Sequence, residues 1–408
     1  MNISIISLGC PRNTVDSEKY LKLLEDKGFR SVEPEKAHAI LINTCGFIEE
    51  AKKESIAVIR RALELKKKGR ISKVIVFGCL VKRYAFELKK HLKGVDAYID
   101  IVNSEEPERQ SLECGHSAYL KISEGCSNLC SYCAIPLIRG KLHSRSPESI
   151  LQEVRFLDAS GVKELSLIAQ DITSWGKDVK GGKDLVWLIG QILTTIKNIR
   201  WIRLLYTHPR FLSKPLIDLI AGQEKICNYI DIPLQHINDR ILKRMNRKIT
   251  RSQIEAKLRL LRAKIPDIAI RTSFMVGFPS ESDKDFFELL AFVSEQRFAN
   301  AGAFIYSQEE KTKASRWKQV PDKTKRSRFD ALMKAQQKIS LERNKTLVGN
   351  IFDVIIDETA KDHSLCRAYF QAREIDTTTT VNKRLKTGTF AKVRITEAYE
   401  YDLVAELI

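Results

Sequence analysis

The most constraining feature of this sequence is a short loop that carries three cysteines. Cys126, Cys130 and Cys133 follow one another in a C-x3-C-x2-C spacing. A strand-like run, YLKIS, precedes Gly125 and the loop, and a helical pattern begins at Glu148, so regular structure fixes both ends. Three thiolates can hold a four-iron cluster and leave one iron without a protein ligand. That free position predicts a site where a small chelating molecule binds and receives an electron.

Two other uses of closely spaced cysteines fit this loop less well. A structural zinc site needs four ligands, commonly arranged as two pairs, and no fourth ligand stands nearby in the sequence. Three cysteines within eight residues are an odd and sterically poor set for disulfides. An iron–sulfur cluster is therefore the favoured interpretation, and zinc is the alternative.

Three further cysteines each follow a strand-like run and stand beside a glycine, namely Cys10, Cys45 and Cys79. Helical patterns at Asp16–Lys27 and Glu49–Lys68 separate these runs, which predicts a β-α-β-α-β unit with a parallel sheet. Ligands gather at the carboxyl ends of such strands, so we expect the three thiols to converge. They would then hold a second cluster, again with one open iron. The alternative is three buried structural cysteines.

The length of 408 residues is sufficient for two or three domains. We expect them at residues 1–115, 116–343 and 344–408. The start, MNISIISLGC, has no basic leader, and its apolar stretch is too short to span a bilayer. Without an export signal, the nine cysteines are expected to stay reduced and to bind metal. We therefore expect a cytoplasmic protein with no membrane segment.

A longer alternation of strands and helices follows, with six strand-like runs between Tyr119 and Tyr306. This pattern predicts an incomplete parallel α/β barrel, in which a site is built from loops at the carboxyl ends of the strands. The cysteine loop follows the first of these strands. Four of the other strands end in polar or glycine-containing segments that are candidate ligand contacts: Gln170-Asp171, Thr207-His208-Pro209-Arg210, Gln235-His236 and Gly277-Phe278-Pro279.

The net charge of +18 suggests an anionic partner such as nucleic acid, but the charge is unevenly spread. Residues 307–345 hold 12 basic and 5 acidic residues, an excess of +7. Residues 345–408 hold 9 Lys or Arg and 10 Asp or Glu, a net of −1, and their short β-branched runs predict a small antiparallel β-barrel. RNA-binding barrels carry a basic patch, so we do not expect this one to bind RNA through bulk charge.

The cysteine loop, with Tyr132 just before its last cysteine, resembles that of the radical S-adenosylmethionine (SAM) enzymes. The three earlier cysteines resemble those of the methylthiotransferases, including their C-terminal TRAM domain, which is an OB-like barrel. The likeness covers essentially the whole chain. Several motifs are similar to the branch that modifies an aspartate of small-subunit ribosomal protein number twelve: SLGCPRN, NTCGFI, KISEGC, IRGKLHSR, IAQD, DIPLQH and MVGFPSE. Arg12, His143 and Ser280 depart from the usual residues of these motifs.

The resemblance implies two four-iron clusters and SAM as cofactors, with no catalytic amino acid because the cofactors carry the radical chemistry. It implies that the N-terminal sheet and the barrel mouth face one another, with the substrate entering between them. It also implies SAM contacts at Tyr132, Gln170, Asp171, Arg271 and Gly277. The remaining cysteines match no ligand position and are expected to be structural: Cys114, Cys227 and Cys366.

The implied function is the addition of a methylthio group to the β-carbon of that aspartate, in the free protein or within the ribosome. The resemblance implies a reductase or flavodoxin-type electron donor as a partner, and a sulfur donor that the sequence does not identify. We expect a monomer. Two alternatives stay open: a tRNA methylthiotransferase acting on a modified adenosine, which the basic upstream charge favours, and a ribosome-associated iron-carrying protein without turnover.

Overall fold

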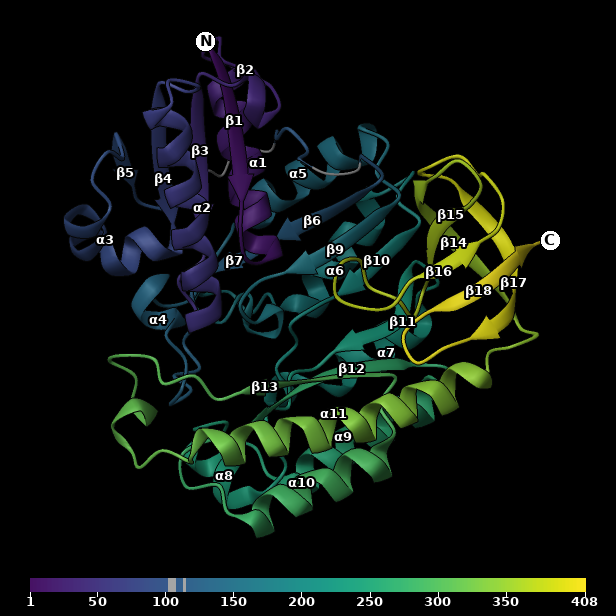
Figure 1. Ribbon diagram of the computed structural model, residues 1–408. Coiled ribbons are helices and arrows are strands. Elements are labelled where there is room, and N and C mark those ends of the chain that lie inside the picture. Colours follow the sequence, from purple (N-terminus) through teal and green to yellow (C-terminus); the bar gives the residue numbers. More distant parts are fainter. Residues whose placement is uncertain (102–107, 113–114) are drawn as a thin grey trace.

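The structure of the protein, a computed structural model, describes residues 1–101, 108–112 and 115–408. It contains an N-terminal sheet, a central open barrel and a small C-terminal closed barrel (Figure 1). This is the predicted α/β architecture. No helix in these ranges combines the length and the apolar character that crossing a membrane requires.

The N-terminal part is a five-stranded parallel sheet in the order β2-β1-β3-β4-β5. The three predicted strands are its centre, and β3 is buried along its whole length. The short edge strands β2 and β5 were not predicted, because two or three residues are too few to show a periodic pattern. The elements are β1 (Asn2–Ser7), α1 (Pro11–Glu25), β2 (Arg30–Ser31), the 3-10 turn η1 (Pro34–Lys36), β3 (Ala39–Thr44), α2 (Glu49–Lys67), β4 (Lys73–Gly78), α3 (Cys79–His91) and β5 (Ala97–Ile99).

The central part is a six-stranded parallel sheet in the order β13-β12-β11-β10-β9-β6, which confirms the predicted strand alternation. Among the described residues the sheet does not close on itself, since β6 and β13 each have one strand neighbour there. Its elements are β6 (Ser117–Lys121), β7 (Ser123–Glu124), α4 (Ile135–Ile138), β8 (His143–Ser144), α5 (Pro147–Ala159), β9 (Glu164–Ile168), η2 (Ile172–Ser174), α6 (Leu185–Thr195), β10 (Trp201–Leu204), η3 (Pro209–Phe211), α7 (Lys214–Gly222), β11 (Ile226–Asp231), α8 (Asp239–Arg244), α9 (Arg251–Lys264), β12 (Ala269–Val276), α10 (Asp283–Gln296) and β13 (Asn300–Ile305).

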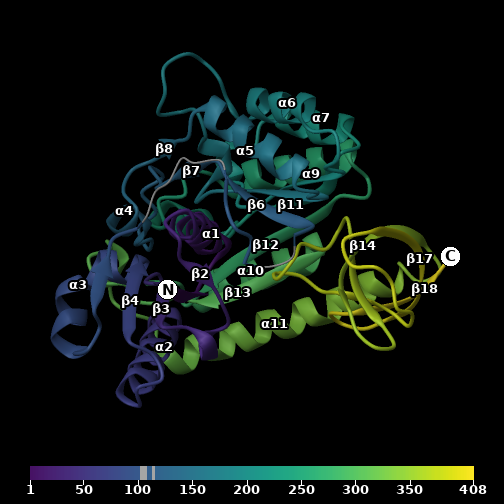
Figure 2. The same cartoon turned by 90° about the horizontal axis from the view of Figure 1, so that it is seen from above.

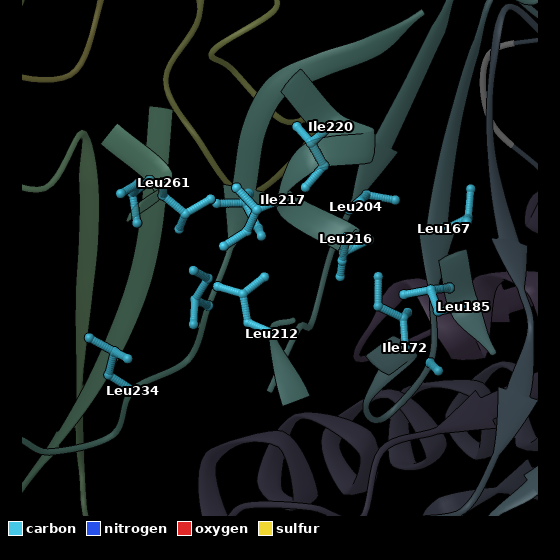
Figure 3. Close-up of a cluster of buried hydrophobic side chains, with 14 of the residues drawn as sticks. Leu167, Ile172, Leu185, Leu204, Leu212, Leu216, Ile217, Ile220, Leu234 and Leu261 are labelled. Atoms are coloured by element: carbon cyan, nitrogen blue, oxygen red, sulfur yellow. The ribbon is translucent and has the colours of Figure 1, made fainter. Parts of the chain in front are cut away.

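The largest hydrophobic core lies between this sheet and its helices. Figure 3 shows Leu167 of β9 and Leu204 of β10 among side chains from α6, α7 and α9, including Leu185, Leu216 and Leu261. All of these side chains are almost fully buried, and burial at this scale contributes about 25 cal/mol per Å² of apolar surface. The core therefore holds the strands, and with them the loops at the strand ends, in a fixed arrangement.

The long helix α11 (Asp322–Lys345) runs beside β13 towards the C-terminal barrel (Figures 1 and 2). The barrel closes in the order β14-β15-β16-β18-β17, and its strands are β14 (Ile351–Thr359), β15 (Ser364–Ala368), β16 (Thr379–Val381), β17 (Phe390–Ala398) and β18 (Leu403–Leu407). Its pairs are antiparallel as predicted, except that β16 and β18 are parallel. The parallel pair closes the barrel, because β18 pairs with β16 on one side and with its sequence neighbour β17 on the other.

The two smaller parts contact different ends of the central strands. The C-terminal barrel packs at their amino ends, where Trp201, the first residue of β10, meets the ring of Phe390 edge-on at 4.9 Å. The N-terminal sheet meets the carboxyl ends, where Arg12 donates to the carbonyl of Ala169, just after β9, at 2.8 Å. In both Figures 1 and 2 the two parts lie on different sides of the central sheet. The N-terminal sheet therefore faces the edge where α/β barrels build their sites.

Candidate functional site

One cavity of about 400 Å³ is bordered by both sets of cysteines. It lies between the carboxyl ends of the N-terminal strands and those of the central barrel, as predicted. Three thiols come from each side: Cys10, Cys45 and Cys79 from the N-terminal sheet, and Cys126, Cys130 and Cys133 from the barrel loop. We call these sets the N-terminal triad and the barrel triad. Their convergence confirms that residues far apart in sequence form a single site.

The N-terminal triad converges because its cysteines directly follow or closely follow neighbouring parallel strands, β1, β3 and β4. The backbones approach so closely that side chains are excluded between them. A Cβ placed on Gly9 would lie 2.8 Å from the Cβ of Cys45, and one on Gly46 would lie 2.8 Å from the carbonyl oxygen of Cys79. These two glycines therefore keep the thiol side chains together at the sheet edge.

The barrel triad is held by contacts from outside its loop. The amide of Cys126 donates to the carbonyl of Gly140 at 3.1 Å. Leu129, between the first two cysteines, has a left-handed φ of 55°, and its carbonyl accepts from the side chain of Asn246 at 2.8 Å. A non-glycine residue in this region is strained unless its surroundings hold it, and such strain gathers at functional sites. The loop is thus fixed by the segment after α8 as well as by its own ends.

The chemistry of the six thiols suits iron–sulfur ligation. All are free cysteines. Within the described ranges, no group of three or more His, Cys, Asp or Glu side chains is close enough together to hold a single metal ion. Burial raises the pKa of both Cys45 and Cys126 to about 11, so these thiols hold their protons at neutral pH until a metal displaces them. Three thiolates can each bind a different iron of a four-iron cluster.

Arg139 connects the central barrel to the N-terminal triad, and we did not predict it as a site residue. It follows α4 in the barrel, yet its Nε donates to Sγ of Cys79 in the N-terminal triad at 3.2 Å. Its Nη1 binds Asp16 of α1 and Glu124, two residues before Cys126, both at 2.9 Å. The side chain is 2% exposed. Because Arg139 is distant from all of these residues in sequence, only the docked domains reveal its role.

Arginines adjoin thiols at two further points. Arg12 stacks over the ring of Tyr206 at 4.6 Å. Burial raises the pKa of the Cys10 thiol, but the charges of Arg12 and Arg139, together with backbone hydrogen bonds, lower this pKa overall. Arg247 lies 3.6 Å from Sγ of Cys130. Both arginines border the cavity. The sequence could have identified Arg12 as a site residue, because it directly follows Cys10-Pro11. Arg247 stands in a loop with no cysteine beside it, so no local sequence signal singles it out.

Four of the five predicted SAM contacts border the cavity: Tyr132, Gln170, Asp171 and Arg271. The amide nitrogen of Gln170 donates to Glu124 at 2.8 Å, while its buried amide oxygen has no hydrogen-bond partner among the described residues. Asp171 accepts from Asn128 of the cysteine loop at 2.8 Å. These contacts leave the amide oxygen of Gln170 free to accept a hydrogen bond and make Asp171 a support for the loop.

Arg271 and Gly277 differ from the prediction. The guanidinium of Arg271 is already paired with Asp231 at 3.1 Å and with Asp376 of the C-terminal barrel at 3.2 Å. Gly277 does not border the cavity. Its φ is +71° and a Cβ there would overlap the side chain of Lys325 on α11, so close packing accounts for this glycine.

Two histidines at strand ends also take different roles. His208 borders the cavity, its Nδ1 accepts from the amide of Arg210 at 3.2 Å, and its buried Nε2 has no partner in the described chain. Burial lowers the pKa of His208 to about 2, which keeps the ring neutral with its proton on Nε2. His236 is fully buried and lies outside the cavity lining. His208 is therefore the histidine that can donate to a bound molecule.

The cysteines expected to be structural are buried where the structure describes them. Cys227 is a core residue, and Cys366 donates to the carbonyl of Thr379 at 3.1 Å. Neither borders the cavity. Cys114 lies outside the described residues.

Comparison with known proteins gives three family matches along the chain. Residues 120–293 match the radical SAM superfamily, residues 2–100 match the uncharacterized protein family UPF0004, and residues 348–408 match the TRAM domain. The cysteine loop lies in the first match and the N-terminal triad in the second. Membership of the radical SAM superfamily implies SAM and a four-iron cluster.

Curated relatives match over the full length. Proteins named ribosomal protein uS12 methylthiotransferase RimO are 44% identical in Thermoanaerobacter sp. (strain X514), covering 99% of both chains, and 41% identical in Syntrophotalea carbinolica, covering 100% of this chain and 96% of the relative. The radical S-adenosylmethionine methyltransferase TsrM from Kitasatospora setae shares the fold, with a TM-score of 0.53 and 13% identity over 89% of this chain and 78% of that one. Full-length identity at this level shows that the chain belongs to the radical SAM methylthiotransferase family.

Proposed function

We propose that this protein replaces a hydrogen on the β-carbon of an aspartate in ribosomal protein uS12 with a methylthio group. The observation that carries the proposal is the shared cavity, in which three thiols from each of two domains face one another. A single cluster with SAM needs only the barrel triad. Transfer of sulfur needs a second sulfur-carrying centre close by, and the N-terminal triad is placed to hold it.

The residues of the cavity support this assignment. The barrel triad would hold the cluster that binds SAM, and the N-terminal triad would hold a second four-iron cluster. Bound together, these groups supply the radical and the sulfur that an unactivated carbon requires. Gln170 and His208 are placed to orient a bound molecule through an amide oxygen and an imidazole N–H. Tyr132 closes the wall behind the cysteine loop, packed edge-on against Phe278 at 6.4 Å.

A protein substrate is supported over tRNA by the names of the full-length relatives and by the C-terminal barrel. The relatives are named for ribosomal protein uS12. The barrel has a net charge of −1 from 9 basic and 10 acidic residues, whereas binding the phosphates of tRNA calls for cationic side chains. A cytoplasmic location, a reductase or flavodoxin-type electron donor and a monomeric state remain predictions that accompany this proposal.

The substrate assignment is tested by offering both substrates to the same enzyme. After anaerobic reconstitution, uS12 and tRNA are incubated separately with SAM and a reductant, and each product is weighed by mass spectrometry. We expect uS12 to gain the mass of one methylthio group in place of hydrogen and tRNA to remain unchanged. Modification of tRNA alone would overturn the assignment of uS12 as the substrate. Absence of 5′-deoxyadenosine would point to a binding protein without turnover.

The assignment of the triads is tested by iron content. Two four-iron clusters correspond to about eight irons per chain. Replacing Cys126, Cys130 and Cys133 by alanine is expected to leave about four and to abolish SAM cleavage. Replacing the N-terminal triad is also expected to leave about four, but with SAM cleavage retained and methylthio transfer lost. Full iron retention in either variant would contradict the ligand assignment.

A further inference from the structure

The two outer strands of the central sheet, β6 and β13, differ in their charged residues. At one edge, α1 packs along β6, and Lys121 of β6 is buried in ion pairs with Asp16 and Glu124. At the other edge, β13 pairs with β12 and packs against the helix α11, and no second strand pairs with it among the described residues. The sequence of β13, NAGAFI, contains no charged residue and no proline. Edge strands often carry charged residues or proline, because an unpaired edge recruits other chains.

The register shows which backbone groups of β13 are open. The amide of Tyr306, the residue after β13, donates to the carbonyl of Val276 in β12 at 3.0 Å. Because backbone direction alternates with a period of two along a strand, Asn300, Gly302 and Phe304 also face β12. The N–H and C=O groups of Ala301, Ala303 and Ile305 therefore point away from the sheet. They form a row of donors and acceptors for which no partner occurs in the described parts of the chain.

Two cavities lie along this open edge. One, of about 330 Å³, is bordered by Asn300, Ala301 and Gly302 of β13 and, on its opposite side, by the segment Ile375 to Thr378 of the C-terminal barrel. The other is the cysteine cavity, which Phe304 borders. Arg271 and Ile375 border both cavities, so the two meet at these residues. The open edge thus leads from the C-terminal barrel to the two triads.

The dimensions and the surface suit an extended peptide. A strand rises about 3.3 Å per residue, so about five residues laid beside β13 extend from the first cavity into the cysteine cavity. A Cβ placed on Gly302 meets no atom within 4 Å, which leaves room for a neighbouring side chain. Phe304 is 51% exposed and borders the cysteine cavity, so it offers apolar contact close to the thiols. Open N–H and C=O groups in strand register are what a peptide backbone recognises.

We propose that β13 binds an extended segment of the protein substrate as an added strand, and that this strand carries the target aspartate into the cavity between the triads. The inference rests on the proposed function, since it takes the substrate to be a protein. It assigns a role to the C-terminal barrel as the opposite wall of the peptide path. A near-neutral wall suits a peptide backbone, which carries no net charge.

The first test uses synthetic peptides that span the target aspartate of uS12, each N-methylated at a single backbone position. Binding to the apoprotein is measured by fluorescence anisotropy, and turnover by the holoenzyme is measured by mass spectrometry. Removing one hydrogen bond is expected to weaken binding about fivefold at every second position and to leave the positions between them unchanged. Equal effects at all positions, or none at any, would overturn strand addition.

The same experiment separates this inference from the substrate assignment. If the unmethylated peptide and intact uS12 are both left unmodified while tRNA is modified, the proposed function fails. If the peptide is modified but its N-methyl series shows no alternation, the proposed function stands and strand docking fails.

The second test changes the enzyme. Gly302→Val adds a side chain to the open edge, and Ile305→Pro removes an outward N–H while leaving the bonds to β12 in place. Both are expected to raise the KM for the peptide about fivefold or more, with unchanged iron content and unchanged 5′-deoxyadenosine formation in the absence of peptide. The matched control is Gly190→Ala on α6, where a Cβ also meets no atom within 4 Å. An unchanged KM in Gly302→Val, or displacement of the peptide by RNA, would contradict the inference.

Discussion

The two small domains are each joined to the central barrel through a buried ionic centre, and the two centres are opposite in sign. On the N-terminal side, Arg139 lies between the carboxylates of Asp16 and Glu124, each at 2.9 Å. On the C-terminal side, Glu164 lies between Arg203 at 2.9 Å and Arg367 at 2.6 Å. Both central side chains are at most 2% exposed.

The two ionic centres differ in whether their central side chain also contacts the thiols of the cavity. Arg139 also donates to the thiol of Cys79 at the cavity, whereas Glu164 is the first residue of β9, at the end of the sheet away from the thiols. One ionic centre therefore serves both assembly and chemistry, and the other serves assembly alone. Buried charges are costly to leave unpaired, so each domain is held in one orientation by its centre.

The largest effect is expected from Arg139→Gln. Removing one partner of a buried ionic centre typically costs about 4 kcal/mol of stability. In this variant Asp16 and Glu124 lose one of their two shared cations and keep only Lys121. We also expect a lower reduction potential for the N-terminal cluster, since a cationic hydrogen-bond donor near its sulfur is lost. Urea denaturation of the apoprotein and EPR-monitored redox titration measure the two effects. Arg139→Lys, which keeps the charge, is the control, and an unchanged potential in Arg139→Gln would remove Arg139 from the chemistry.

Glu164→Gln is expected to destabilise the protein by about 3 kcal/mol without affecting the clusters. The variant leaves two buried guanidinium groups facing a neutral amide. Urea denaturation gives the free energy of unfolding, while iron content and the potential of each cluster are expected to match the original protein. A shift in either reduction potential would show that the C-terminal ionic centre also influences the clusters. The two ionic centres would then no longer differ in function.

The pH dependence of stability sharpens the same contrast. Burial alone would raise the pKa of Glu164, but the guanidinium groups of Arg367 and Arg203 hold its pKa below the usual range. A carboxylate with a lowered pKa in the folded state contributes stability above its ordinary pKa, near 4, and loses that contribution as the pH falls further. Between pH 7 and pH 3 we expect the original apoprotein to lose about 2 kcal/mol more than Glu164→Gln. If the free energy of unfolding of the two proteins fell equally with pH, Glu164 would not have the lowered pKa assigned to it.

The smallest effect is expected from Gly46→Ala, which tests the packing of the N-terminal triad. Its Cβ would lie 2.8 Å from the backbone oxygen of Cys79, so the strand ends must separate at a cost of about 1–2 kcal/mol. We expect iron bound at the N-terminal triad to fall while the barrel cluster keeps its iron and SAM cleavage continues. Gly190→Ala, which adds a methyl group in open space on α6, is the control and is expected to leave both clusters intact.

The cysteine pattern and the alternation of strands and helices could be predicted from the sequence, because both depend on short stretches of chain. Cys126, Cys130 and Cys133 lie within one loop, and Cys10, Cys45 and Cys79 each follow an apolar run of strand type. Parallel strands bring their carboxyl ends to one edge, so convergence follows from the pattern alone. The same reasoning placed Gln170 and Asp171 at the cavity, since they directly follow β9.

Gly277 and Arg271 show where that reasoning stops. Both stand in or just after β12, as a ligand contact should, but α11 packs against Gly277 and Asp376 of the C-terminal barrel pairs with Arg271. Those partners lie about fifty and one hundred residues further along the chain. The position of a residue at a strand end does not reveal which distant segment will already occupy its side chain.

The sequence by itself determined the two triads, the alternation of strands and helices and the near-neutral C-terminal barrel. These depend on residue type and on periods of two to four residues. Only the tertiary structure decided that Arg139 reaches Cys79, that the C-terminal barrel covers the amino ends of the strands, and that β13 keeps an open edge beside the thiols. The physical reason is that docking between domains depends on the fit of whole surfaces, which no local pattern records.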